Sequence, residues 1–183
     1  WTAKNRGMVS FSGGVHVSGW RPWKDDILVA DVPIGGNLPD FHGGSEEFYS
    51  KRLNFPLWLY QAGSRLDCAR YPNRPAEDWD YEHGYLKTGA TVGGLVGRFD
   101  RYQKSVSGVF RCASPRLAEW AKETDLWAYG LFMHEYADMK MAVTNVDLVA
   151  KTLALDNRWY PRGFRQGAPF YVFNARCEID RPG

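Results

Sequence analysis

The stretch from Asp125 to Asp156 constrains the fold more than any other part of the chain. Residues 126–134 are largely apolar on both alternating faces, which is typical of a strand covered on both sides. Residues 139–146 alternate again, and residues 150–155 form a third short apolar run. The links between these runs are short, so we predict an antiparallel meander. A meander buries its apolar face only against a second sheet or by closing on itself.

The rest of the chain adds strand signals and a single helical pattern. Ser114 and Pro115 are typical of a helix start, with Ser114 as the N-cap and a helix of about two turns ending near Thr124. Residues 21–26 are predicted to form a turn, and residues 176–182 an irregular tail. The predicted strands cover residues 8–20, 27–32, 90–97, 108–112 and 170–174, with a hairpin over 55–71. The predicted fold class is therefore mainly β, an antiparallel β-barrel or sandwich with one short α-helix.

Composition limits the classes of function. A chain of 183 residues suits a single domain, and its 44% hydrophobic and 24% charged residues are ordinary for a globular protein. A net charge of +2 argues against nucleic acid or a membrane surface as partner. The aromatic content of 15%, with eight Trp, is high. These rings either fill a thick β core or form exposed platforms for sugar rings or bases.

The cysteines and the chain ends give further expectations. Cys68, Cys112 and Cys177 have no C-x-x-C spacing, so no zinc site is predicted. One disulfide with a remaining thiol is compatible with their number, and three buried free thiols are the simpler prediction. No apolar run reaches the roughly 18 residues of a transmembrane helix. The chain opens on Trp1 and resembles a piece of a longer protein.

Several phrases together resemble a known domain. Two of them are the most specific: the hairpin that ends in Ala69-Arg70-Tyr71-Pro72-Asn73, and the closing segment from Phe173 to Gly183. The complete set is GGVHVSGW (13–20), ILVADVP (27–33), PLWLYQAGSRLDCARYPN (56–73), DLWAYG (125–130), YAD (136–138) and FYVFNARCEIDRPG (170–183). This pattern resembles the β-barrel insertion domain of right-handed parallel β-helix enzymes of the glycoside hydrolase family 141 type. It departs at Gln61-Ala62-Gly63, where an Asn-Gly turn is usual, and at Arg176-Cys177-Glu178, where two acids often stand together.

The resemblance implies that this chain is a non-catalytic part of a larger enzyme. Residues 1–12 are then a remnant of a parent β-helix coil, and residues 13–183 are a single β-barrel insertion domain. The catalytic carboxylates of such enzymes lie on the β-helix, so no catalytic residue is expected here. The parent would be secreted or periplasmic. The expected partners are a polysaccharide or oligosaccharide and the parent β-helix domain, without nucleic acid or membrane.

Carboxylate pairs were weighed as catalytic groups because glycoside hydrolysis needs an acid and a base or nucleophile on either side of one bond. Asp25-Asp26 and Glu46-Glu47 are adjacent in sequence, so they point to opposite sides of an extended chain and are interpreted as solvated. Glu135 and Asp138 flank a turn. His134 is interpreted as a hydrogen-bonded wall residue of its strand, and no metal or cofactor is predicted.

Aromatic platforms are the preferred functional hypothesis. A pyranose ring stacks its C–H face on Trp or Tyr, while its hydroxyls bind polar side chains beside the ring. Loops at 79–83, 157–162 and 20–23 carry that mixture. Asp78, Asp80 and Glu82 could also form a calcium or sugar-hydroxyl site, or simply a polar loop. The glycan-binding candidates are Trp79, Asp80, Tyr81, Trp159, Tyr160 and Arg162.

Three functions remain open at this point. The first is a non-catalytic accessory domain that shapes the substrate cleft of a secreted β-helix glycoside hydrolase or binds glycan weakly. The second is a purely structural or oligomerisation insertion. The third is a small glycosidase in its own right, using Asp78, Asp80 or Glu135.

Overall fold

The computed structural model describes residues 14–32, 59–75, 80–93, 108–136, 138–156 and 164–180. The chain divides into two compact units, Trp1–Asp40 and Phe41–Gly183. The predicted boundary near residue 12 lies outside the described residues and stays a prediction.

The described part of the first unit is a β-hairpin. Strands β1 (Arg21–Lys24) and β2 (Ile27–Val29) pair antiparallel across a turn in which Asp25 has a φ of 51°. The prediction of a turn over the whole of 21–26 is thus wrong, because Arg21 and Pro22 find partners in β2. The strand predicted over 8–20 is not seen in its described part, residues 14–20.

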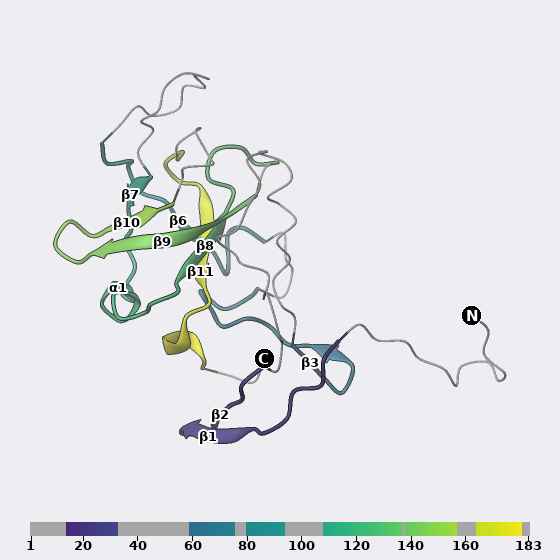
Figure 1. The fold of residues 1–183 in the computed structure, drawn as a ribbon. Helices are drawn as coiled ribbons and strands as arrows, with labels where there is room; N and C mark the ends of the chain where they lie inside the picture. The colour runs from purple at the N-terminus through teal and green to yellow at the C-terminus, as the bar shows by residue number, and fades with distance from the viewer. Residues whose placement is uncertain are drawn as a thin grey trace. The chain divides into compact units, whose positions relative to one another are not determined.

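The predicted meander forms the centre of the second unit (Figure 1). It consists of β8 (Trp127–Gly130), β9 (Met139–Asp147) and β10 (Thr152–Leu155), paired antiparallel in that order. The first strand ends at Gly130, earlier than predicted. The turn between β9 and β10 starts later, because the Asp147 carboxylate accepts hydrogen bonds from the backbone N–H groups of Val149 (2.9 Å) and Ala150 (2.8 Å).

Further strands extend this sheet on both sides. Its order is β5-β11-β8-β9-β10-β7, and β6 also pairs with β11. The added strands are β5 (Arg70–Tyr71), β6 (Leu86–Lys87), β7 (Val109–Arg111) and β11 (Pro169–Phe173). The mainly β fold with antiparallel pairing is confirmed, but the paired strands form no closed barrel among the described residues.

Residues 88–92 link the part of the sheet that contains β11 to the edge strand β7. Thr88 donates its backbone N–H to Ala168, just before β11, and Gly89 donates to Arg111 in β7. A Cβ at position 89 would lie 2.7 Å from the Arg111 carbonyl oxygen, so only glycine permits this crossing. The strand predicted over 90–97 is reduced in its described part to one bridge, between Thr91 and Phe110.

Four phenylalanines form the centre of the core. Phe110, Phe132, Phe164 and Phe170 are fully buried, and their ring centroids lie 5.1 to 6.3 Å apart, several of them edge to face. These rings come from β7, β11 and the segments around the sheet. Edge-to-face packing of this kind adds to the free energy gained by burial.

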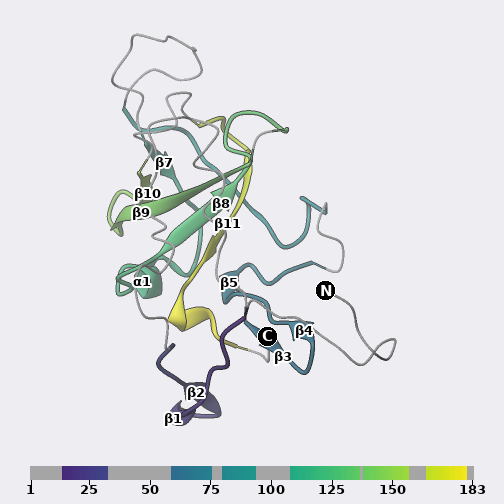
Figure 2. The same ribbon diagram turned by 45° about the vertical axis from the view of Figure 1, so that its right-hand side comes forward.

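Two short helices and a small hairpin complete the described part of the second unit. Helix α1 (Leu117–Trp120) is shorter than predicted, and the Ser114 hydroxyl accepts a hydrogen bond from the Arg116 N–H without being the N-cap. The predicted tail contains a 3-10 helix, η2 (Arg176–Glu178). Strands β3 (Tyr60–Gln61) and β4 (Ser64–Arg65) confirm the predicted hairpin turn, although Arg70 pairs with β11 instead of continuing the returning arm. Figure 2 shows these elements from a second side.

Candidate functional site

Two of the predicted glycan-binding residues, Asp80 and Tyr81, belong to the described structure. They lie in the loop that leads into β6. Trp79, Trp159, Tyr160 and Arg162 lie outside the described residues.

Asp80 orders its own loop. One carboxylate oxygen accepts backbone hydrogen bonds from Glu82 and His83, each 3.1 Å long, and the other lies 2.9 Å from Nδ1 of His83. These hydrogen bonds, the side-chain contact with His83 first, lower the pKa of the Asp80 carboxyl. Asp80 therefore positions the exposed side chains beside it.

Tyr81 is the outer member of a row of four tyrosines. Its ring is 36% exposed and meets Tyr85 edge to face, with centroids 5.0 Å apart. Tyr85 meets Tyr171 at 5.6 Å, and Tyr171 stacks on Tyr129 at 4.9 Å. We call Tyr81, Tyr85, Tyr171 and Tyr129 the tyrosine row.

The tyrosine row lies on the sheet face opposite the core. Tyr171 and Tyr129 are direct cross-strand neighbours in β11 and β8. The residues on either side of Tyr171, Phe170 and Val172, belong to the core. Because successive side chains of a strand point to opposite faces, Tyr171 faces away from it. The row is thus an aromatic surface built on a rigid strand pair.

Arg70 fixes the centre of the row. Its guanidinium carbon lies 3.4 Å from the ring centroid of Tyr171 and 5.2 Å from that of Tyr85. Its Nε donates to the Pro72 carbonyl at 2.9 Å, and its Nη2 donates to the Gly84 carbonyl. Burial lowers the pKa of the Arg70 guanidinium. Arg70 thus ties β5 to two backbone carbonyls as well as to the tyrosine rings.

Tyr129 is held at the inner end of the row. Burial first, and then the negative charge of Asp138, raise the pKa of its hydroxyl. Asp138 comes from the loop between β8 and β9. The Tyr129 hydroxyl therefore stays protonated at neutral pH.

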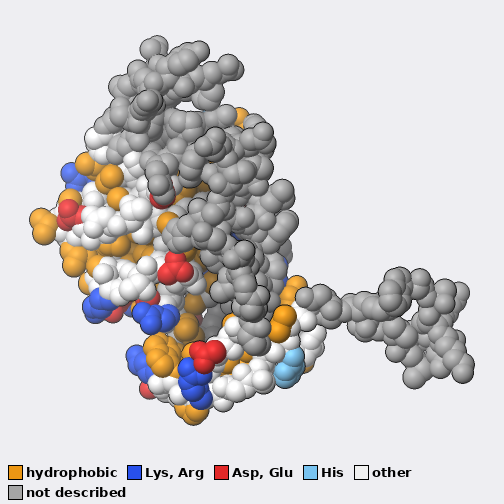
Figure 3. Space-filling model, viewed as in Figure 1, with side chains coloured by type: hydrophobic (Ala, Val, Ile, Leu, Met, Phe, Trp, Pro, Cys, Tyr) orange, Lys and Arg blue, Asp and Glu red, His pale blue; other side chains and the backbone are white. Residues whose placement is uncertain are grey.

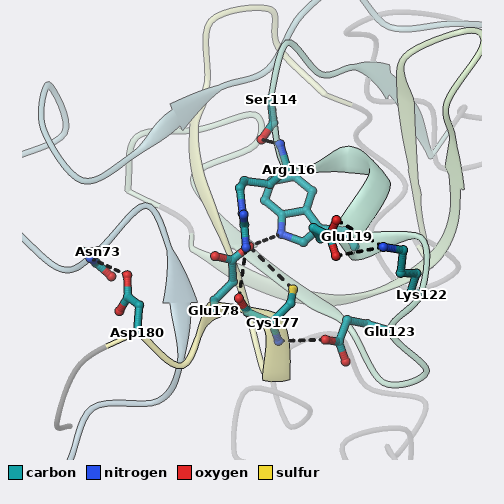
Figure 4. Close-up of polar contacts among 10 residues, drawn as sticks. Asn73, Ser114, Arg116, Glu119, Lys122, Glu123, Cys177, Glu178 and Asp180 are labelled. Atoms are coloured by element: carbon teal, nitrogen blue, oxygen red, sulfur yellow. Dashed lines mark hydrogen bonds and ion pairs between the residues drawn. The ribbon is translucent and has the colours of Figure 1, made fainter. Parts of the chain in front are cut away.

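A polar network that the sequence did not predict joins α1 to η2 (Figure 4). The buried Glu178 carboxylate accepts hydrogen bonds from Trp120 Nε1 at 2.7 Å and from Arg116 Nε at 3.0 Å. Glu123 accepts from the backbone N–H of Cys177 at 2.9 Å. We call these five residues the Glu178 network. The carboxylates of Glu178 and Glu123 thus accept hydrogen bonds that link the region of α1 to the region of η2.

The three cysteines are free thiols with different exposure. Cys68 is exposed, which contradicts the prediction that all three are buried, while Cys112 is buried and Cys177 half-buried. Cys68 is exposed because it precedes β5 outside any strand. Burial raises the pKa of Cys112 to about 11. Burial and the hydrogen bond to Glu123 raise the pKa of Cys177 to about 12.

Thiol alkylation tests this difference. We expect iodoacetamide at pH 8 to label Cys68 first, because the thiol pKa is raised at all three cysteines and Cys68 is the one exposed to the reagent. Mass spectrometry of the peptides, with a denatured sample as the control, gives the order of labelling. Labelling of Cys112 as fast as Cys68 in the folded protein would contradict the packing around β7.

Metal sites and membrane-spanning helices were both sought among the described residues. No group of three or more His, Cys, Asp or Glu side chains among them is arranged to hold a metal ion. No helix in the described part of the chain is long and apolar enough to cross a membrane. Comparisons of the chain with protein families, with curated proteins and with solved structures give no match.

Proposed function

We propose that this chain is a non-catalytic accessory β domain of a secreted β-helix glycoside hydrolase, which binds glycan weakly beside the substrate cleft of its parent enzyme. The resemblance of the sequence to insertion domains of such enzymes supports the proposal. The structural observation that carries it is the outer end of the tyrosine row, where an oriented aromatic ring is surrounded by exposed polar groups.

The surroundings of Tyr81 suit a sugar ring. The side chains of Glu82 and His83 are 84% and 81% exposed. The Lys87 ammonium group donates a hydrogen bond to the Tyr81 carbonyl at 2.7 Å. Together with the hydrogen bonds from Glu82 and His83 to Asp80, this contact fixes the backbone around Tyr81. A pyranose that stacks on Tyr81 finds a carboxylate and an imidazole within the same loop for its hydroxyls.

Three acids of the described structure support a non-catalytic role. A glycosidase needs two carboxyl groups free to face one glycosidic bond. Glu178 and Glu123 accept hydrogen bonds within the Glu178 network, and Asp80 accepts them from its own loop. The glycosidase alternative predicts release of reducing sugar by the purified chain, and our proposal predicts none.

One surface feature favours the second alternative, a purely structural or oligomerisation insertion. The tip of the β9–β10 hairpin exposes hydrophobic side chains (Figure 3), with Leu148 49% and Val149 96% exposed. Under this alternative the tyrosine row is purely structural, and the chain binds no glycan.

Binding measurements with a single exposed ring removed test the proposal. We expect the chain to migrate more slowly in native gels that contain xylan or galactomannan, and Tyr81→Ala to weaken binding about three- to tenfold, because a stacked ring contributes on the order of 1 kcal/mol. The melting temperature should change little, since Tyr81 lies at the exposed end of the row.

The matched control is Tyr60→Ala. Tyr60 is an exposed tyrosine of the β3–β4 hairpin, outside the tyrosine row, so its removal should leave binding unchanged. Equal migration with and without every polysaccharide would refute glycan binding and favour the structural alternative.

A further inference from the structure

A second exposed aromatic ring lies in the loop between β8 and β9. Tyr136 is 80% exposed, and its ring stacks on His134 with centroids 5.1 Å apart and an angle of 13° between the planes. A single exposed tyrosine is common on protein surfaces. Here one ring face is covered by the imidazole, so the ring is oriented and its other face is open to solvent.

The residue before this tyrosine is one partner of an ion pair. Glu135 precedes Tyr136, and its carboxylate lies 3.5 Å from Nη1 of Arg165. The backbone of Arg165 is fixed, because its N–H donates to the Phe132 carbonyl at 2.7 Å and its carbonyl accepts from the Thr88 hydroxyl at 2.6 Å. The Nε of Arg165 is buried without a hydrogen-bond partner within the described structure. Glu135 and Arg165 thus form an acceptor and a donor with no net charge, and Glu135 adjoins Tyr136 in the chain.

The same loop reaches the tyrosine row. Asp138 lies close enough to Tyr129 to raise the pKa of its hydroxyl, after the larger effect of burial. Asp138 and Tyr136 are two residues apart in a loop whose ends are set by the pairing of Gly130 with Met139. The loop is therefore anchored at both ends, by the tyrosine row and by Arg165.

We propose that Tyr136 is a second sugar-stacking subsite for neutral pyranose rings, with Glu135 and Arg165 as hydrogen-bonding partners of the sugar hydroxyls. This inference rests on the proposed glycan binding. The open ring face supplies the stacking surface. Because the carboxylate and the guanidinium neutralise one another, the site offers hydrogen bonds without an electrostatic preference for an acidic sugar.

Variants that remove the ring or only its hydroxyl test the subsite. In native gels that contain galactomannan, we expect Tyr136→Ala to weaken binding about three- to tenfold and Tyr136→Phe to bind within twofold of the wild type. Tyr60→Ala serves again as the exposed control, and melting temperatures should agree for all variants because both rings are at the surface. Binding of polygalacturonate should be no tighter than that of galactomannan, because the neutralised pair offers no net charge to an acidic sugar.

The outcomes separate this inference from the proposed function. If Tyr81→Ala weakens binding and Tyr136→Ala does not, the subsite is refuted while the glycan-binding function stands. Equal loss in Tyr136→Phe and Tyr136→Ala would refute stacking as the mode of recognition. Tighter binding of polygalacturonate than of galactomannan would refute the neutral ligand class. Failure of the wild type to bind any polysaccharide would refute the proposed function and the subsite together.

Discussion

Replacing Phe110 with alanine should lower the free energy of unfolding by about 3–5 kcal/mol, the usual cost of removing a fully buried phenylalanine. Phe110 meets Phe164 at 5.3 Å, Phe170 at 5.1 Å and Phe132 at 6.3 Å. It also bridges the two sides of the sheet, since its strand β7 pairs with β10 while its backbone bridges to Thr91. Urea denaturation followed by far-UV circular dichroism measures the change.

The matched control for Phe110 is an exposed apolar residue. Val149→Ala at the tip of the β9–β10 hairpin should change the stability by less than about 0.5 kcal/mol, because that side chain is in solvent. If Phe110→Ala cost less than about 1 kcal/mol, the four phenylalanines would not form the centre of the core.

Replacing Glu178 with alanine should cost about 2–4 kcal/mol. The change leaves the Trp120 indole N–H buried without an acceptor, which by itself costs about 1–3 kcal/mol. It also removes the charge partner of Arg116, whose partial exposure to water keeps the loss below that of a fully buried pair. Thermal unfolding followed by tryptophan fluorescence is suited to this measurement, because Trp120 lies in the network.

Two further variants serve as comparisons for the stability loss in Glu178→Ala. Glu178→Gln keeps an acceptor for Trp120 and should be less harmful than alanine. Glu119→Ala removes an ion pair with Lys122 on the surface of the same region, and should cost less than about 0.5 kcal/mol. A loss for Glu119→Ala as large as that for Glu178→Ala would mean that the helix, and not the network, is the sensitive element.

The sequence predicted the parts of the fold that depend on local patterns. The alternation over 126–155 indicated the β8–β9–β10 meander because strand pairing there needs only short links. Gly63 indicated the β3–β4 turn, where it adopts a φ of 84°. Both features follow from residues that are close together in the chain.

Such local patterns do not predict contacts between residues that are far apart in the chain. Glu178 meets Trp120 across 58 residues, and no local signal marks an acid in a polar tail as the acceptor of a buried indole. Likewise Arg70 leaves its hairpin to pair with Phe173 in β11. The path of residues 88–92 also depends on the close contact of Gly89 with Arg111, which the sequence does not reveal.

The candidate site was predicted in part. The loop with Asp80 and Tyr81 was found from its mixture of aromatic and acidic residues, but its connection to Tyr171 and Tyr129 required the strand register. Tyr136 was missed because His134 was interpreted as part of a strand. Ending β8 at Gly130 places both rings in a loop, where they stack.

The most direct test of the account is a titration of the isotope-labelled chain with neutral oligosaccharides, followed by two-dimensional amide NMR. Our account predicts chemical-shift changes that saturate and that cluster in loop residues 80–85 and 131–138, with the Phe110 core unmoved. An absence of shifts at millimolar sugar, or shifts confined to the tip of the β9–β10 hairpin, would contradict it.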